Sequence, residues 1–508
     1  MQPILLTNGT IIDGTGKAAE RGDVLICADR IAEVGIFAAP EECEKIDCTG
    51  LIIAPGFIDG HNHLDLQALE DRPARAVQGI TSEVVGNCGF SAYPCDPDKT
   101  KLREFANGIL CGDEHWGWHS AKDYFSAVAR SKTTLNVASL IGHGSLRIAV
   151  AGNKSGQLSE AELTTMEGKL DEALSEGSCG FSTGLMYAPG ASAPFAELER
   201  LCKVVARHNK IYTTHIRSYF SDLLPSIEEQ IELARRTGCR LQISHLQAVG
   251  AQNWALQQPA LEKIEAAQHA GIDIAFDCYP YVAGSTVLTQ VLPQSALDGG
   301  VNAMLARLQD TDERRCIAAA TEAALQWRWN DIYISAVGST RNQAALKHNL
   351  QELGEAHSKA PVEAMMDLLL EEKGDVNIIC FNQCEENLQQ TLTHPLSLII
   401  SDGFYVKGQP HPRLHGTFPH LLGEFCRERK WLTLPEAIRK ITDFPAQRFG
   451  LKNMGRLQPG YQADVTIFNP EQIKSPASYD QPELAPVGIN YVSRKGHCVL
   501  KNAEARTQ

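Results

Sequence analysis

The chain has 508 residues, of which 43% are hydrophobic and 21% are charged, and its formal net charge is −14. Such a balance supplies a large hydrophobic core, and the acidic charge disfavours nucleic acid or an anionic membrane as a partner. No apolar run reaches the roughly 18 residues of a transmembrane helix. Fifteen scattered cysteines without a CxxC pair predict reduced thiols and a cytoplasmic protein.

The two ends of the chain both read as short strands separated by turn residues. PILLTNGTIIDG, DVLICADRIAEVG and GLIIAPG stand at the start, and GRLQPGYQADVTIFNP and INYVSRKGHCVLKN follow Pro445. We expect a hairpin around Asn8-Gly9, because Asn-Gly is a favoured two-residue turn, and the start lacks the basic region of a signal peptide. These patterns predict a small β-sandwich domain formed by residues 1–55 and 446–508.

Between the ends, strand-like stretches alternate with amphipathic helical ones. Eight stretches read as strands: GFIDGHNHLD, ITSEVVGNCGF, LNVASLIGHG, GFSTGLMY, IYTTHIRS, LQISHLQ, IDIAFDCYPY and LSLIISDG. Eight βα units in one run predict an α/β fold, a (β/α)8 TIM-like barrel over residues 56–445. Residues 290–375 fit the alternation poorly and read as an insertion before the last strand.

His61 and His63 stand at the end of the first predicted barrel strand, in GFIDGHNHLD. Residues two apart on a strand point to the same side, and the carboxyl ends of barrel strands form the active-site mouth. Two neutral imidazoles in that place are suitable ligands for Zn²⁺. Taken alone, such a pair is equally consistent with packing or capping.

Further ligand-type side chains follow the other predicted strands. A single histidine or cysteine in such a place is usually a core residue, but several at one barrel mouth together predict a metal site. The additional candidate metal ligands are Cys88, His215, His245 and Asp402.

Two other motifs offer alternatives to a metal hydrolase. GFSTG fits the G-x-S-x-G pattern of a serine nucleophile around Ser182. That motif requires a helix directly after the serine, whereas LMYAPG follows here, so we keep a serine esterase only as a distant alternative. His143 ends another strand, where a role in substrate binding and a structural role are equally consistent with the sequence.

The whole chain resembles the amidohydrolase superfamily, through LLTNGTIIDGTG, PGFIDGHNHLD and GRLQPGYQADVTIF. Within it, the chain is most similar to the N-acyl-D-amino-acid deacylase (D-aminoacylase) family. GNCGFS, GFSTGLMYAPG, THIRSY, FDCYPYVAGST, ISDG and HPRLHGTFP carry that narrower resemblance. Many superfamily members bridge two metals with a lysine on the fourth strand, but CGFSTGLMY has none, and Cys88 occupies the position that replaces it in this branch.

The resemblance implies the arrangement of the metal ligands and the chemistry. Cys88, His215 and His245 would hold one tightly bound Zn²⁺. A second, weaker metal position would be lined by His61, His63 and Asp402, with Cys88 as a bridge. Metal-activated water would attack the amide carbonyl of an N-acyl-D-amino acid, and Asp402 would act as general base and then general acid.

The resemblance also implies a small-molecule substrate and the residues that bind it. Arg413 would pair with the substrate carboxylate, together with Tyr279, Ser285 and Tyr187. The family commonly has a lysine where this chain has Gln247, which weakens the expected contact with that carboxylate. A cyclic amide (hydantoin- or dihydropyrimidine-like) or a dipeptide is therefore the alternative substrate, and a binding protein that retains the scaffold is a third possibility. The oligomeric state is left open.

Overall fold

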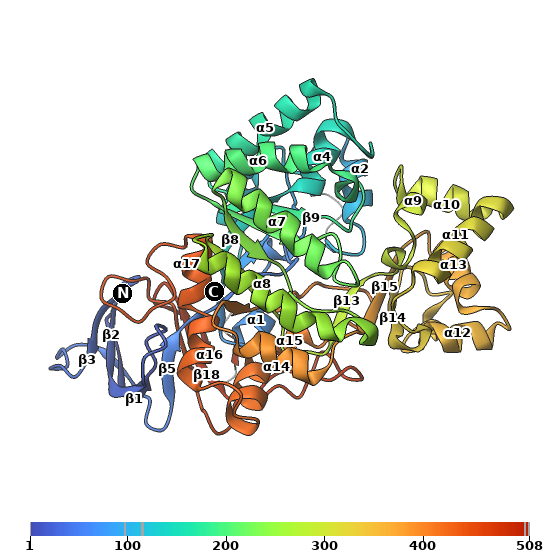
Figure 1. Ribbon diagram of the computed structural model, residues 1–508. Helices are drawn as coiled ribbons and strands as arrows, with labels where there is room; N and C mark the ends of the chain where they lie inside the picture. The colour runs from blue at the N-terminus through green and yellow to red at the C-terminus, as the bar shows by residue number, and fades with distance from the viewer. Residues whose placement is uncertain (1, 96–97, 113–115, 502–503, 506–508) are drawn as a thin grey trace.

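The computed structural model describes residues 2–95, 98–112, 116–501 and 504–505. Its centre is a parallel sheet of eight strands that curls into a nearly closed barrel (Figure 1). In sheet order the strands are β6 (Phe57–Asp59), β7 (Ile80–Val85), β8 (Asn136–Gly142), β9 (Gly180–Gly184), β10 (Ile211–His215), β11 (Arg240–Ile243), β12 (Ile274–Cys278) and β16 (Ser397–Ile399). Seven of the eight strands lie within the stretches predicted from sequence, and β11 begins one residue before its stretch, so the barrel fold is confirmed.

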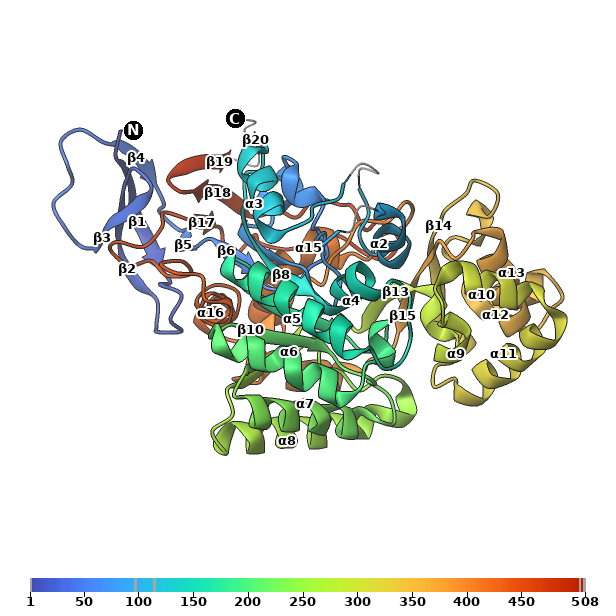
Figure 2. The ribbon, with the colours of Figure 1, turned by 90° about the horizontal axis from the view of Figure 1, so that it is seen from above.

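Amphipathic helices cover the outside of the barrel, and α5–α8 form one continuous layer beside strands β8 to β10 (Figure 2). α5 begins with a capping box in which Ser159 and Glu162 bond each other's backbone N–H groups. The barrel helices are α1 (Pro73–Ala76), α2 (Lys99–Ala106), α3 (Ala121–Arg130), α4 (His143–Ala151), α5 (Glu160–Ser175), α6 (Phe195–Arg207), α7 (Leu223–Thr237), α8 (Gln257–His269), α14 (Glu385–Thr393), α15 (Arg413–His420), α16 (Leu434–Lys440) and α17 (Asp443–Phe449). Every described helix is too short or too polar to cross a lipid bilayer.

A separate sheet joins the two ends of the chain. Its N-terminal strands are β1 (Ile4–Ile11), β2 (Glu20–Cys27), β3 (Arg30–Gly35), β4 (Glu44–Asp47) and β5 (Ile52–Pro55). Its C-terminal strands are β17 (Val465–Phe468), β18 (Ile489–Arg494), β19 (His497–Lys501) and β20 (Glu504–Ala505). β5 and β17 pair antiparallel and connect the two halves.

The predicted hairpin at Asn8-Gly9 is wrong, because both residues lie inside β1. Asn8 has a φ of 61°, and the register against β2 shifts between Leu6 and Gly9. The Asn-Gly pair therefore forms a bulge in a continuous strand rather than a turn. A side chain at Gly9 would clash with Ile53, so packing also requires glycine there.

The insertion has its own sheet and helices, on the opposite side of the barrel from strands β1–β3 (Figures 1 and 2). The antiparallel strands β13 (Ala283–Val287), β15 (Val376–Phe381) and β14 (Ile332–Val337) lie in that order. The helices are α9 (Gln294–Leu297), α10 (Val301–Gln309), α11 (Thr311–Ala324), α12 (Leu350–Ala356) and α13 (Pro361–Glu371). The sheet of this unit begins at Ala283 and ends at Phe381, so it extends beyond the 290–375 expected for the insertion on both sides.

Pro445 does not mark a return to short strands. It lies in the first turn of α17, where a proline is tolerated because the first N–H groups have no partner in the helix. Phe444 and Phe449 of this helix pack with Ile400 in the core around the last barrel strand. The expected boundary at residue 446 thus falls inside a helix that packs on the barrel.

A buried ionic network joins the first, second and last barrel strands. Glu83 of β7 accepts hydrogen bonds from Arg72 at 2.5 Å and from Arg75 at 2.6 Å. Arg75 also pairs with Asp59 of β6, and Asp59 accepts the backbone N–H of Ser401, beyond β16, at 2.9 Å. Burial alone would raise the pKa of Glu83, but the two guanidinium groups hold it below its usual value.

We expect Glu83→Gln to lower the free energy of unfolding by about 3–5 kcal/mol, because two buried guanidinium groups lose their carboxylate. Denaturant titration followed by circular dichroism measures the change. As a control, Arg315→Ala removes an exposed ion pair with Asp312 and is expected to change stability by less than about 1 kcal/mol. Equal effects of the two substitutions would contradict the importance of the network.

Candidate metal centre at the barrel mouth

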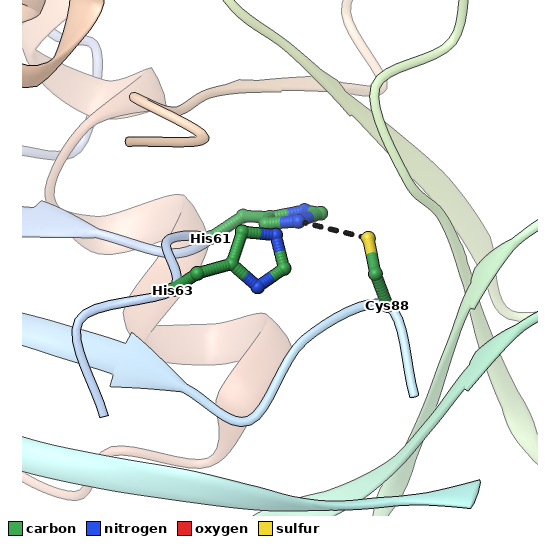
Figure 3. A group of neighbouring side chains, drawn as sticks. All are labelled: His61, His63 and Cys88. Carbon is green, nitrogen blue, oxygen red and sulfur yellow. Dashed lines mark hydrogen bonds between the residues drawn. The ribbon is translucent and has the colours of Figure 1, made fainter. Parts of the chain in front are cut away.

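The structure brings together the six side chains that the strand ends predicted as metal ligands, and all six are buried. In two groups of three, the ligand atoms lie within 4.8 Å of one another. The first group is His61, His63 and Cys88, and the second is Cys88, His215 and His245. Figure 3 shows the first group, in which the His61 ring faces the Cys88 sulfur. Cys88 belongs to both groups and lies between them.

The distances around Cys88 are short enough for shared ligation. Its Sγ lies 3.3 Å from Nε2 of His61 and 3.4 Å from Nε2 of His245. The rings of His215 and His245 have centroids 4.6 Å apart. Asp402 Oδ1 lies 3.3 Å from Nε2 of both His61 and His63.

Three of these residues adopt the left-handed backbone conformation, which is unfavourable for residues other than glycine. Cys88 has a φ of 51°, His245 of 33° and Asp402 of 49°. Each lies two or three residues beyond the end of a barrel strand, at the barrel mouth where the candidate ligands meet. Strained conformations of this kind persist at functional sites because the surrounding structure enforces them.

Ser182 supports the turn that carries Cys88. Its hydroxyl donates to the carbonyl of Gly86 at 2.5 Å and accepts from the N–H of Gly89 at 3.0 Å. The side chain is fully buried, and β9 continues into a turn rather than a helix. A nucleophilic serine has an exposed hydroxyl at the start of a helix, so the esterase alternative is wrong.

Asp277 of β12 is a part of the site that sequence reasoning missed. Its Oδ1 lies 3.3 Å from Nδ1 of His61 and accepts the backbone N–H of His245 at 2.7 Å. Its Oδ2 accepts from the side chain of Gln242 at 3.2 Å. A carboxylate behind a metal-binding histidine fixes the ring and its tautomer. A lone aspartate in the wholly buried strand IAFDC was the signal that could have revealed it.

Three of the histidines are neutral near pH 7, the form that binds a metal. Burial lowers the pKa of His245 to about 4 and holds that of His63 below its usual value. Burial and the neighbouring His245 lower the pKa of His215 strongly. Within the described residues, neither ring nitrogen of His215 has a hydrogen-bond partner. Since buried polar atoms normally have partners, these donors fit a metal ion such as Zn²⁺.

The thiol of Cys88 is protonated in the protein without metal. Burial raises its pKa to about 11, although His61 opposes the shift. A thiolate is the form that binds a metal. Metal uptake is therefore coupled to release of a proton.

Asp402 pairs with Arg413 as well as with the histidines. Nη1 of Arg413 lies 3.0 Å from Oδ2 of Asp402. Burial alone would raise the pKa of Asp402, but Arg413 and His63 hold it well below its usual value. The carboxylate is therefore ionised and is held at the edge of both ligand groups.

The remaining candidate residues lie around a pocket that opens next to the ligands. Tyr187, Tyr279 and Ser285 line this pocket, while Arg413 lies behind it with its guanidinium 4.7 Å from the ring centroid of Tyr279. Arg413 also donates to the backbone oxygen of Ser285 at 3.3 Å. Gln247 lines the pocket and accepts a hydrogen bond from Tyr279 at 3.1 Å. No lysine or arginine is among the described residues that line it.

His143 has a structural position. It begins α4, is fully buried, and its Nε2 lies 2.8 Å from Glu197. It is absent from the described lining of the pocket. Of the two roles that the sequence left open, the geometry supports the structural one.

Comparison with known proteins agrees with this geometry. Residues 44–500 match the model of the amidohydrolase family. The N-acyl-D-glutamate deacylase of Alcaligenes xylosoxydans xylosoxydans is 34% identical over 98% of this chain and 94% of its own length. The crystal structure of N-acyl-D-glutamate deacylase from Bordetella bronchiseptica, complexed with zinc and a phosphonate inhibitor, has a TM-score of 0.84 and 33% identity, covering 100% of this chain and 98% of its own.

Two further structural similarities bear on the number of metals and on the alternative substrate. A structure of D-aminoacylase, described with a binuclear metal centre, has a TM-score of 0.85 and 30% identity over 100% of this chain and 98% of its own. The L-hydantoinase of Arthrobacter aurescens has a TM-score of 0.56 at 14% identity over 100% of this chain and 98% of its own. The hydantoinase shares the fold alone, so the cyclic-amide alternative gains no support.

We expect His215→Ala to lower the affinity for zinc, because it removes a predicted ligand. Loss of a residue that only hydrogen-bonds to a metal ligand lowers metal affinity roughly 10–100-fold, and the effect here should be larger. Zinc content after exhaustive dialysis, measured by plasma mass spectrometry, checks this. His357→Ala changes an exposed histidine and is expected to retain the wild-type content. Equal zinc in both variants would contradict the ligand set.

Proposed function

We propose that this chain, which belongs to the amidohydrolase family, hydrolyses the amide bond of N-acyl-D-amino acids to a carboxylate and a free amino acid with zinc as cofactor. The observation that carries the proposal is the Cys88 thiol shared by two groups of buried, metal-binding side chains at the barrel mouth. Full-length similarity to N-acyl-D-glutamate deacylase and to D-aminoacylase supports the reaction class.

Cys88, His215 and His245 would hold the tighter zinc ion, because both histidines are neutral and, among the described residues, the ring nitrogens of His215 and Nδ1 of His245 have no hydrogen-bond partner. His61, His63 and Asp402 would line a second, weaker position, with Cys88 as the bridge. Bound zinc acts as a Lewis acid on a carbonyl and makes water nucleophilic near neutral pH.

Asp402 would carry the proton during the reaction. Its ionised carboxylate lies 3.3 Å from His61 and His63, beside the place where water and substrate meet the ligands. As general base it takes a proton from water, and as general acid it delivers that proton to the leaving nitrogen. Arg413 keeps the carboxylate ionised before the first transfer.

Arg413 and the hydroxyl groups beside it would recognise the substrate carboxylate. Tyr279 and Ser285 lie between the Arg413 guanidinium and the pocket. Burial raises the pKa of Tyr279 and of Tyr187, so both phenols remain hydrogen-bond donors. Gln247 contributes a neutral amide in place of a lysine, so this chain would hold the carboxylate with one fewer cation.

The domain organisation, the cellular compartment and the partner of the protein are also proposed. We propose that both ends of the chain form a small β-domain, expected over residues 1–55 and 446–508, beside a hydrolase barrel expected over 56–445, with helix α17 crossing the boundary at 446 and packing on the barrel. The separate sheet around β5 and β17 supports the small domain. The scattered cysteines support a reducing cytoplasm. The partner is a small-molecule amide rather than nucleic acid, as the net charge of −14 suggests.

We expect Asp402→Asn to retain its tighter zinc while kcat falls by roughly 10²–10⁴-fold, the usual contribution of a general base. Zinc analysis and steady-state kinetics on the same preparation measure both quantities. Asp222→Asn changes an exposed aspartate and serves as the matched control. Normal turnover of Asp402→Asn would contradict the proton-carrying role.

A hydrolysis screen of matched substrates tests the reaction itself. Zinc-loaded protein is expected to cleave N-acetyl-D-methionine with a kcat/KM at least roughly 10–200-fold above that for the L-isomer, the range that one misfitting group costs. A chelator should abolish the activity and added zinc should restore it. Faster cleavage of a hydantoin, a dipeptide or the L-isomer would contradict the proposed substrate class.

A further inference from the structure

A second cavity adjoins the catalytic pocket, and the reaction as proposed leaves it without a role. The two cavities share Ile109, Tyr187 and Gln290 as lining residues. Their volumes are about 700 and 730 Å³, with the open solvent at their mouths included. The second cavity, here called the side chamber, lies between α2 and the insertion helices and is as large as the first.

The side chamber begins directly behind the metal ligands. The ring of Tyr187 lies 4.9 Å from that of His215 and 4.9 Å from that of Phe90. Phe90 in turn lies 6.2 Å from His63 and stacks on Phe105 at 4.5 Å. The Tyr187 ring therefore lies between the metal ligands and the side chamber and lines both cavities.

The wall of the chamber is largely apolar, with the uncharged polar residues Asn107, Asn153, Thr289 and Gln290 among its lining. Its buried apolar residues include Phe90, Ile109, Val287, Leu297 and Met304. The described lining has no lysine, arginine or histidine, and its one charged residue, Glu104, accepts a hydrogen bond from Asn302 at 3.2 Å. A carboxylate would be repelled here, whereas a hydrocarbon chain would lose its contact with water.

Strand β13 runs from the surroundings of Arg413 to the wall of the side chamber. Ser285, in the middle of the strand, accepts a hydrogen bond from Arg413 through its backbone oxygen, and Val287, at the end of the strand, lines the side chamber. Two residues along a strand span roughly 7 Å, so the chamber wall at Val287 lies about that far from the backbone that contacts Arg413. Two hydrogen bonds connect the insertion to the barrel near the chamber. Gln294 donates to the backbone oxygen of Met186, and Asn302 donates to the carboxylate of Glu104.

We propose that the side chamber binds the acyl chain, and that the enzyme acts on N-acyl-D-amino acids whose acyl group is a medium-length hydrocarbon chain rather than acetyl. The inference rests on the proposed deacylase function and names its acyl specificity. Water adds to the acyl carbon, the C–N bond breaks, and the nitrogen takes the proton. The acyl product is then a fatty carboxylate. It can leave because the described lining of the chamber has no lysine, arginine or histidine to bind its charge.

Matched kinetics on N-acetyl-, N-butanoyl- and N-octanoyl-D-methionine test the acyl specificity. We expect kcat/KM to rise at least roughly tenfold from acetyl to octanoyl, because each methylene that enters the chamber leaves water. Val301→Trp places a large side chain in the chamber from the partly buried first residue of α10. This variant should lose most of the octanoyl advantage and retain acetyl turnover.

The control is Ala306→Trp, which adds the same side chain at an exposed position of α10 and should leave all three rates unchanged. Equal kcat/KM for acetyl and octanoyl in the wild type, or parallel loss of both in Val301→Trp, would overturn the inference. If no N-acyl-D-amino acid is cleaved, the deacylase function fails, and octanoate binding by calorimetry then tests the chamber separately. Octanoate that binds more tightly than acetate only while Val301 is intact supports the chamber, and equal binding refutes it.

Discussion

The Asp277 carboxylate holds two sides of the candidate metal centre at once. One oxygen fixes the ring of His61 from the first barrel strand and the backbone of His245 from the sixth. The other accepts from Gln242, which also accepts from buried Arg448. Because one group positions ligands from distant parts of the sequence, the spacing between the two ligand groups around Cys88 depends on it.

The closure of the barrel gives the centre its remaining rigidity. Asp59 ties the first strand to Ser401, and the N–H of Asp402 donates to the carbonyl of His61 at 2.8 Å. These contacts bring the last strand against the first, so Asp402 meets His61 and His63. The left-handed conformations of Cys88, His245 and Asp402 persist because the surrounding network enforces them. The contacts that close the barrel thus also position the candidate metal ligands.

Sequence predicted the barrel and its candidate ligands because the signal is local. Each ligand-type residue follows a short apolar run, and parallel strands in a barrel end on the same side. The role of those residues as ligands stays a prediction, although the structure brings all six together. Asp277 was not predicted as part of the site, because its three partners, His61, Gln242 and His245, come from other strands and the segments that follow them. The bulge at Asn8 and the helix around Pro445 depend on packing that a turn motif does not encode. The chamber wall combines α2 with the distant insertion and has no pattern in sequence.

The central claim is that Cys88, which belongs to both ligand groups, is a ligand of the tighter zinc ion. X-ray absorption at the zinc edge, recorded on metal-free protein loaded with one equivalent of zinc, measures this directly. The account predicts one sulfur ligand at about 2.3 Å together with imidazole nitrogens, and loss of the sulfur signal in Cys88→Ser. A first zinc ion surrounded by nitrogen and oxygen alone would contradict it.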